Sequence, residues 1–158
     1  MDIQKILVPI DYSGDAYQAL QCGASLAEKY GAQVILLHAI PKAELTSPTA
    51  SSYKEMSPGI WTKHPIMIDL QVKARVELHL FAYKNFKGCM PVHVKVAVGK
   101  PAEEIVRVAR EEGVDLIVMG THGRTGVQHL LLGGVAEEVA RHAPCPVFTV
   151  RSGAAAAA

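Results

Sequence analysis

The stretch Lys5-Ile-Leu-Val-Pro-Ile-Asp-Tyr-Ser-Gly-Asp15 contains the change of pattern on which the fold depends. Residues 5–10 are mostly apolar, in a run long enough for a strand and too short for a helix. Asp11 or Ser13 can then cap a helix, because a short oxygen-bearing side chain satisfies the free N–H groups of the first turn. Small and apolar residues follow at helical spacing until Gly31. The stretch therefore predicts a strand that leads into a helix over 13–30.

The same alternation continues to the end of the chain. Further strands are predicted at 33–40, 91–98, 114–119 and 147–150, and further helices begin at Pro101 and after Gly134. Most of these strands are apolar at nearly every position, as in parallel sheets that are buried on both faces. Alternating strands and helices predict an α/β fold, with a single parallel sheet, right-handed crossovers and helices on both faces.

Residues 41–86 are harder to assign. Residues 41–64 are rich in Ser, Thr and Pro, which predicts a long surface loop in which Trp61 is a candidate to close over a ligand. Between Leu70 and Leu80 apolar and polar residues alternate as in a half-buried strand, yet Leu70, Ala74 and Leu78 also share one helical face. We predict a helix over 66–86, because about twenty residues exceed a usual strand and suit a crossover between parallel strands.

The composition is that of one globular domain. The chain has 158 residues, 49% apolar and 20% charged, enough for a single compact core. Sixteen Lys and Arg against fifteen Asp and Glu leave a net charge of +1, so no electrostatic argument favours nucleic-acid binding. No apolar run reaches the roughly 18 residues of a membrane-spanning helix, and residues 1–7 lack the order of a signal peptide. We therefore expect a cytoplasmic protein with no nucleic-acid or membrane partner.

Cysteines and the chain end add little to the functional argument. Cys22, Cys89 and Cys145 are far apart and form no CxxC pair, so free thiols are expected rather than a disulfide framework or a zinc site. Gly153 and the five alanines at 154–158 are typical of an added tag or an unassigned tail. We take residues 1–152 as the domain.

A glycine-rich segment from Gly120 to Gly134 is the strongest candidate for a functional site. Glycines allow several N–H groups to converge on one anion, and the Gly133-Gly134 pair opens a helix whose N-terminus attracts phosphate. Arg124 can add a charged hydrogen bond. A tight surface turn would also use glycines, but this segment follows a buried strand. In parallel sheets ligands bind beyond the carboxyl ends of the strands, which favours residues 9–11, 39–41 and Gly120 onward.

Two common nucleotide-binding motifs are absent from the sequence. No GxxxxGK[ST] occurs, so there is no P-loop lysine with a neighbouring hydroxyl for magnesium. No GxGxxG follows the first strand, where Val8-Pro-Ile-Asp-Tyr-Ser13 stands instead. These absences disfavour a P-loop protein and a standard NAD-type Rossmann protein.

The segment instead resembles the nucleotide motif of the universal stress proteins, specifically of their ATP-binding branch. That motif is Gly, two residues, Gly, nine residues, Gly, then Ser or Thr. Gly120, Gly123 and Gly133 match it, and Gly134 stands at the Ser or Thr position. The resemblance covers residues 3–150, is weakest over 41–64, and extends to four further stretches: Lys5-Ile-Leu-Val-Pro9, Leu36-Leu-His-Ala39, Gly99-Lys-Pro-Ala102 and Asp115-Leu-Ile-Val-Met119.

The resemblance implies a Rossmann-like sheet of five parallel strands in the order 3-2-1-4-5, with ATP across the strand ends. Asp11 would face the ribose or the phosphates beside Pro9 and Ile10, and the main chain of Ala39 would contact adenine. The residues implied at the ribose are Met119 and Gly120, and those implied at the phosphates are Gly123, Arg124, Gly133, Gly134 and Val135. A magnesium or manganese ion would be held mainly through the phosphates. Family members commonly form homodimers through the last strand, here 147–150, whose apolar edge also favours pairing with a second copy.

The glycine at position 134 bears on affinity. A hydroxyl-to-phosphate hydrogen bond is worth on the order of 1.5–3 kcal/mol, or roughly a tenfold to hundredfold change in dissociation constant. Because glycine keeps the backbone N–H, we expect weaker binding rather than none, and Gly134→Ser should tighten it.

Three classes of function remain open. The first is an ATP-binding regulatory protein, the second a slow ATPase or phosphotransfer enzyme in which Asp11 or His122 would activate water, and the third a nucleotide-free dimeric interaction protein. His38 lies in an apolar strand and is expected to be a hydrogen-bonded interior residue. His122 and His129 flank the glycine-rich segment, where contact with phosphate and simple exposure are equally expected. No zinc-type histidine pair is present.

Overall fold

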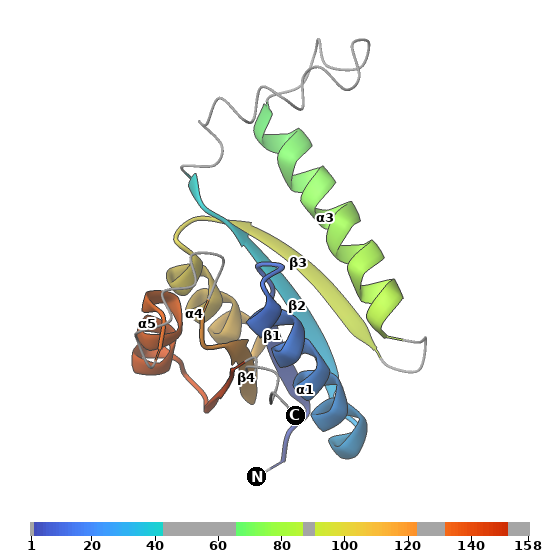
Figure 1. The fold of residues 1–158 in the computed structure, drawn as a ribbon, viewed down its shortest axis with the longest axis vertical. Helices are drawn as coiled ribbons and strands as arrows, with labels where there is room; N and C mark the ends of the chain where they lie inside the picture. Colours follow the sequence, from blue (N-terminus) through green and yellow to red (C-terminus); the bar gives the residue numbers. More distant parts are fainter. Residues whose placement is uncertain (1, 43–65, 87–90, 123–131, 152–158) are drawn as a thin grey trace, which may run out of the picture.

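A computed structural model describes residues 2–42, 66–86, 91–122 and 132–151. They form one sheet of five parallel strands in the order β3-β2-β1-β4-β5, as the sequence predicts (Figure 1). The strands are β1 (Lys5–Pro9), β2 (Gln33–Ile40), β3 (Val92–Val98), β4 (Leu116–Gly120) and β5 (Val147–Val150). The helices are α1 (Gly14–Tyr30), α3 (Ile66–Asn85), α4 (Pro101–Glu112) and α5 (Gly134–His142). Trp61 and the predicted loop around it lie outside the described residues.

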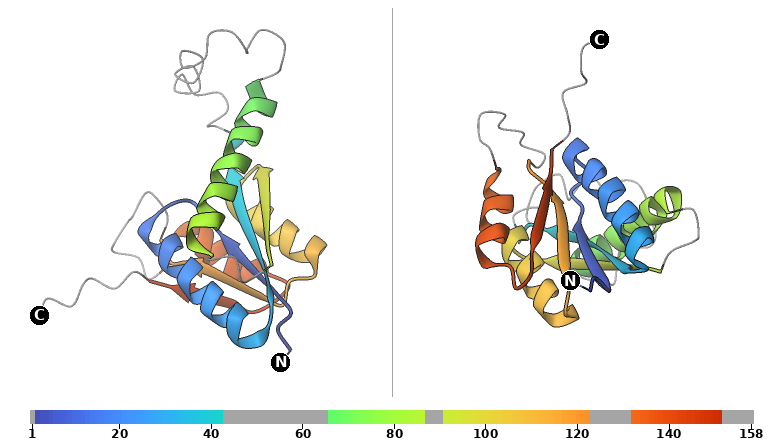
Figure 2. Two further views of the ribbon diagram at one scale, coloured as in Figure 1. Left: turned by 90° about the vertical axis from the view of Figure 1, so that its right-hand side faces the viewer. Right: turned by 90° about the horizontal axis from the view of Figure 1, so that it is seen from below.

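The helices cover the sheet from both sides, with α1 and α3 on one face and α4 and α5 on the other (Figure 2). Successive residues of β1 point to opposite faces, so Ile6 and Val8 pack with α1 and α3 while Leu7 packs with α4 and α5. All three are fully buried. This two-sided burial explains why the strands read as continuous apolar runs.

The first helix begins as its sequence predicts. Ser13 is the N-cap, and its hydroxyl accepts a hydrogen bond from the Ala16 N–H at 3.2 Å. At the other end Gly31 adopts a left-handed conformation with φ of 66°, which costs glycine little because it has no Cβ.

Helix α3 confirms the helical interpretation of residues 66–86 and explains the competing pattern. Ala74 and Leu78 are buried against the sheet, as the helical spacing predicts, and Ala82 is buried one turn further along. Apolar residues also recur on the opposite, solvent-facing side, where Val72, Val76 and Leu80 are each more than half exposed. A helix with apolar residues on two opposite faces resembles a strand when only its alternation is counted.

Candidate functional site

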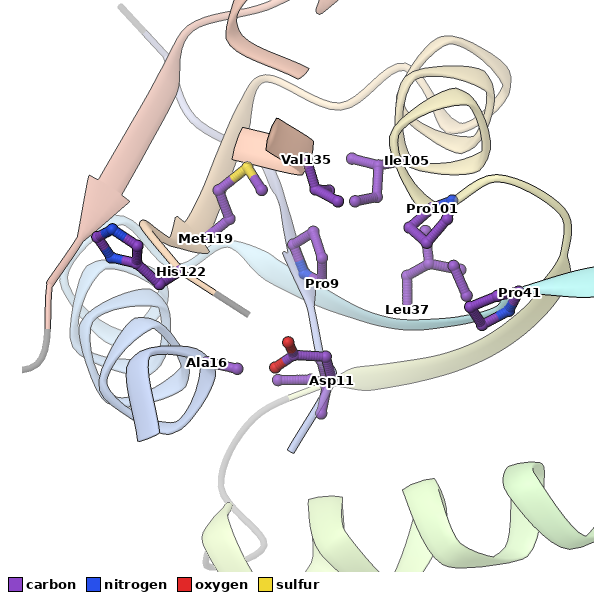
Figure 3. A pocket seen from close by; sticks show the side chains of 13 residues that line it. Pro9, Asp11, Ala16, Leu37, Pro41, Pro101, Ile105, Met119, His122 and Val135 are labelled. Atoms are coloured by element: carbon purple, nitrogen blue, oxygen red, sulfur yellow. The ribbon is translucent and has the colours of Figure 1, made fainter. Parts of the chain in front are cut away.

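A pocket of about 330 Å³ opens at the carboxyl ends of the central strands (Figure 3). Its position is the switch point of the sheet, because the connections from β1 lead toward β2 and β3 on one side while β4 and β5 lie on the other. The volume is at the lower end of the range for small-molecule sites. The lining residues are Pro9, Ile10, Asp11, Ala16, Leu37, Ala39, Pro41, Pro101, Ile105, Met119, Gly120, His122 and Val135.

The walls of the pocket are mainly apolar and come from both layers of helices. Figure 3 shows Pro9 at its centre, with Ile105 of α4 and Val135 of α5 above it and Met119 of β4 to one side. Leu37 approaches from β2. Such walls suit a flat, weakly polar group such as a nucleobase, with polar contacts supplied by the main chain and a few side chains.

Asp11 contributes a carboxylate to this pocket. Its Oδ1 accepts hydrogen bonds from the Ser13 backbone N–H at 2.9 Å and from the Ser13 hydroxyl. Asp11 thus holds Ser13, which is the N-cap of α1, and also lines the pocket. Tyr12, which lies between Asp11 and Ser13, has φ of 64° and packs its ring edge-on against Phe81. A left-handed non-glycine residue is strained, which indicates that surrounding contacts hold the Asp11 turn in place.

A buried polar cluster lies behind the β4 side of the pocket. The Asp15 carboxylate, in the first turn of α1, accepts hydrogen bonds from the Thr121 hydroxyl at 2.8 Å and from the His122 N–H at 3.0 Å. The first helical turn also favours a negative charge because of the helix dipole. In Figure 3 the His122 ring points away from Pro9 and Asp11, and its Nδ1 is 2.9 Å from the Thr121 hydroxyl.

The start of α5 lies next to the pocket through Val135. Its N-cap is Gly133, which offers no side-chain hydrogen bond to the first helical turn. The N–H groups of that turn therefore receive no hydrogen bond from the side chain of the N-cap residue, and they carry the positive end of the helix dipole. The described residues leave space there, since none of their atoms would lie within 4 Å of a Cβ added at Gly134.

The structure brings together seven of the eleven residues predicted for the site. Pro9, Ile10, Asp11, Ala39, Met119, Gly120 and Val135 line the pocket. Gly133 and Gly134 lie directly before Val135 in the chain but are not among the lining residues. Gly123 and Arg124 lie outside the described residues, as does His129.

Sequence reasoning missed several lining residues, most clearly Pro101 and Ile105 of α4. Helix α4 follows β3, an edge strand, and nothing local shows that its first turns reach the centre of the sheet. Pro41, which directly follows the end of β2, was not missed: it lies in the range 39–41 that the strand-end rule favours, and it lines the pocket. At the N-cap of α4, the hydrogen bond from Lys100 to Glu103 at 2.8 Å raises the pKa of the lysine.

His38 is the hydrogen-bonded interior histidine that the sequence predicts. It is buried, and its Nδ1 lies 2.7 Å from the carbonyl oxygen of Ile10. The contact joins β2 to the end of β1 beside the pocket, so the histidine supports the wall of the site.

Within residues 2–42, 66–86, 91–122 and 132–151, no three His, Cys, Asp or Glu side chains are grouped to hold a metal ion. A metal on this part of the chain would need other ligands, such as phosphate oxygens and water. None of the helices described above is both long and apolar enough to cross a membrane.

The model of the universal stress protein family matches residues 2–151, and the chain belongs to that family. The universal stress protein MJ0531 of Methanocaldococcus jannaschii is 30% identical over 148 residues, which cover 94% of this chain and 82% of the relative. MJ0577 of the same organism is 31% identical over 153 residues, and the match covers 94% of each of the two chains.

Solved structures share the fold. The structure of MJ0577 matches with a TM-score of 0.76 at 30% identity, over 97% of this chain and 99% of that one. A universal stress protein from Archaeoglobus fulgidus, solved in complex with dAMP, matches with a TM-score of 0.62 at 23% identity over 95% and 99% of the two chains.

Proposed function

We propose that this chain binds an adenine nucleotide, ATP in the first place, in the pocket between β1, β4 and α5. The main observation in its favour is that apolar walls, a carboxylate and a helix N-terminus lie at successive positions around the pocket. Apolar walls at Pro9, Leu37 and Ile105 suit the base, the carboxylate of Asp11 suits ribose hydroxyls, and the start of α5 suits phosphate.

Related structures support a nucleotide at this fold. The Archaeoglobus fulgidus protein was solved with dAMP, and another universal stress protein, with a TM-score of 0.65 at 24% identity, was solved with cAMP. These ligands belong to those proteins. For this chain the choice of ATP rests on the pocket and on the glycine spacing at Gly120, Gly123 and Gly133.

Calorimetric titration with ATP, adenosine and GTP tests the proposal. ATP should bind more tightly than adenosine, because its phosphates reach α5. It should also bind more tightly than GTP if the main chain near Ala39 hydrogen-bonds to adenine. Asp11→Asn should weaken ATP binding by about tenfold, since a hydrogen bond to a charged group is worth about 1.5 kcal/mol or more. The amide can still accept the bond from the Ser13 N–H.

A surface variant of similar chemistry, Glu111→Gln, provides the control because Glu111 lies on the exposed side of α4 in an ion pair with Arg107. Its affinity for ATP should equal that of the unchanged chain. Equal affinities for ATP in all three proteins would contradict the role of Asp11, and no heat with any nucleotide would contradict the site.

We further propose that the bound nucleotide regulates a partner surface, with hydrolysis slow or absent. Asp11 is the carboxylate among the described lining residues, and its Oδ1 is occupied by Ser13, an arrangement that favours binding over water activation. Phosphate release measured with ATP and Mg²⁺ should therefore be slow and should change little in Asp11→Asn. Fast turnover that is lost in this variant would instead establish the enzymatic alternative. The cytoplasmic location stays a prediction.

A homodimer through β5 is part of the same proposal. In the described sheet β5 pairs only with β4 and so forms an edge, and Phe148 on it is 49% exposed. Pairing with a second copy would cover an apolar strand edge that otherwise favours aggregation. Light scattering at micromolar concentration should give twice the mass of the chain, and Phe148→Glu should lower it. A monomeric mass for the unchanged chain would refute the dimer. If that monomer still bound nucleotide, the nucleotide-binding proposal would stand without the dimer.

A further inference from the structure

Thr121 is a buried polar residue at the point where the chain leaves β4, and its backbone and side chain together bond to three distant elements. Only 6% of the residue is exposed. Its N–H donates to the Val150 carbonyl at 2.9 Å, and its own carbonyl accepts from the Gly133 N–H at 2.7 Å. Its hydroxyl donates to Asp15 at 2.8 Å. One residue thus joins the end of β4 to β5, to the cap of α5 and to the first turn of α1.

Close packing accompanies these hydrogen bonds. A Cβ at Gly120 would lie 2.7 Å from the Cβ of Asp15 and 2.9 Å from its carbonyl carbon. A Cβ at Gly133 would lie 3.0 Å from the carbonyl oxygen of Thr121. The segment 120–122 is therefore held at fixed distances from both α1 and the start of α5.

The bond from Gly133 to Thr121 matters most for a ligand. Because Gly133 is the N-cap of α5, its position sets the direction in which the first N–H groups of the helix point. Asp15 fixes the Thr121 hydroxyl and the His122 N–H, and through Thr121 it fixes that cap relative to Gly120 at the pocket wall.

We propose that Thr121, held by Asp15, is the positioning residue that aligns the start of α5 with the phosphate end of the bound nucleotide. The inference rests on the proposed function and deepens it. Neither residue needs to touch the ligand. Loss of the hydroxyl would loosen the relation between the pocket wall and the α5 cap, and the contacts at Pro9, Leu37 and Ala39 would remain.

The test compares ATP with adenosine in Thr121→Val, Thr121→Ser and the unchanged chain. Valine has nearly the shape of threonine but cannot donate to Asp15. Thr121→Val should weaken ATP binding by about tenfold, the worth of about one such hydrogen bond, and should leave adenosine binding within about twofold. Thr121→Ser should restore the affinity for ATP. Ser25→Ala, which removes a hydroxyl from an exposed position of α1, is the control and should change neither affinity.

A second variant keeps the test decisive if Thr121→Val does not fold. Asp15→Asn retains an acceptor while removing the charge, and it should lower the ratio of ATP to adenosine affinity in the same direction by a smaller factor. Equal weakening of ATP and adenosine, or no rescue by serine, would overturn the positioning role while leaving the proposed function intact. Failure of the unchanged chain to bind any nucleotide would overturn both.

Discussion

The end of β4 and the start of α5 both approach the pocket with glycine, but the two glycines stand in opposite surroundings. At Gly120 an added Cβ would meet Asp15 and Ala16 of α1 at 2.7–3.0 Å. At Gly134 an added Cβ would meet no atom of the described residues within 4 Å. The first glycine is required by the packing of the fold, whereas at the second the described residues leave space for a larger side chain.

Two glycines of the same motif can therefore have different structural roles. Gly120 lets α1 approach the β4 strand end closely enough for Asp15 to reach Thr121. Gly134 has no comparable constraint among the described residues, since it begins a helix without a positive φ and none of their atoms lies within 4 Å of an added Cβ. A motif match alone would give both positions the same weight.

Gly120→Ala should have the largest effect. The new methyl group would press on the backbone of α1, and overpacking of this kind costs about 3 kcal/mol when backbone must move. Urea unfolding should show that loss. Affinity for ATP should fall as well, because the pocket wall and Asp15 shift together. Unfolding at the same urea concentration as the unchanged chain would show that the packing around Gly120 is looser than described.

Gly134→Ser should have the next largest effect, on binding rather than on stability. A hydroxyl at the start of α5 can donate to a phosphate oxygen, worth about 1.5 kcal/mol, so ATP should bind roughly tenfold more tightly. Adenosine, which has no phosphate, should bind as before. Calorimetry measures both. Unchanged or weaker affinity for ATP would place the phosphates away from α5.

Gly134→Ala should have the smallest effect and serves as the control for both glycine variants. It adds a methyl group in open space without a hydroxyl, so affinity for ATP should not rise. Stability should increase by a few tenths to about 1 kcal/mol, because alanine favours the helix and restricts the unfolded chain. Destabilisation in urea would mean that the space at Gly134 is filled.

Much of the fold could be predicted because its strands and helices alternate with distinct periods. The apolar runs of β1, β2 and β4 were clear from local sequence, and the strand order came from the family resemblance. Local sequence left Asp11 and Ser13 both open as the cap of α1, and in the structure the cap is Ser13. Helix α3 could not be assigned from periodicity alone. Its exposed residues Val72, Val76 and Leu80 add a second apolar face that imitates the pattern of a strand.

Prediction of the site was less complete, for reasons of distance along the chain. The switch-point rule identified residues at the ends of β1, β2 and β4. It could not identify Ile105, because only the packing of α4 against the centre of the sheet brings this residue to the pocket. Nor could it find the bond between Asp15 and Thr121, which are 106 positions apart. Such contacts depend on tertiary packing and have no local sequence pattern.

The nucleotide content of freshly purified protein tests most directly whether the pocket holds an adenine nucleotide. The protein is denatured and the supernatant analysed by chromatography with mass spectrometry, alongside a melting experiment with added ATP and Mg²⁺. Ligand at a hundred times its dissociation constant adds about 2.7 kcal/mol, or about 5–10 °C for a domain of this size. We expect bound adenine nucleotide, or a melting shift of this order. A protein that holds no bound nucleotide and shows no melting shift with ATP would contradict a nucleotide site in this pocket.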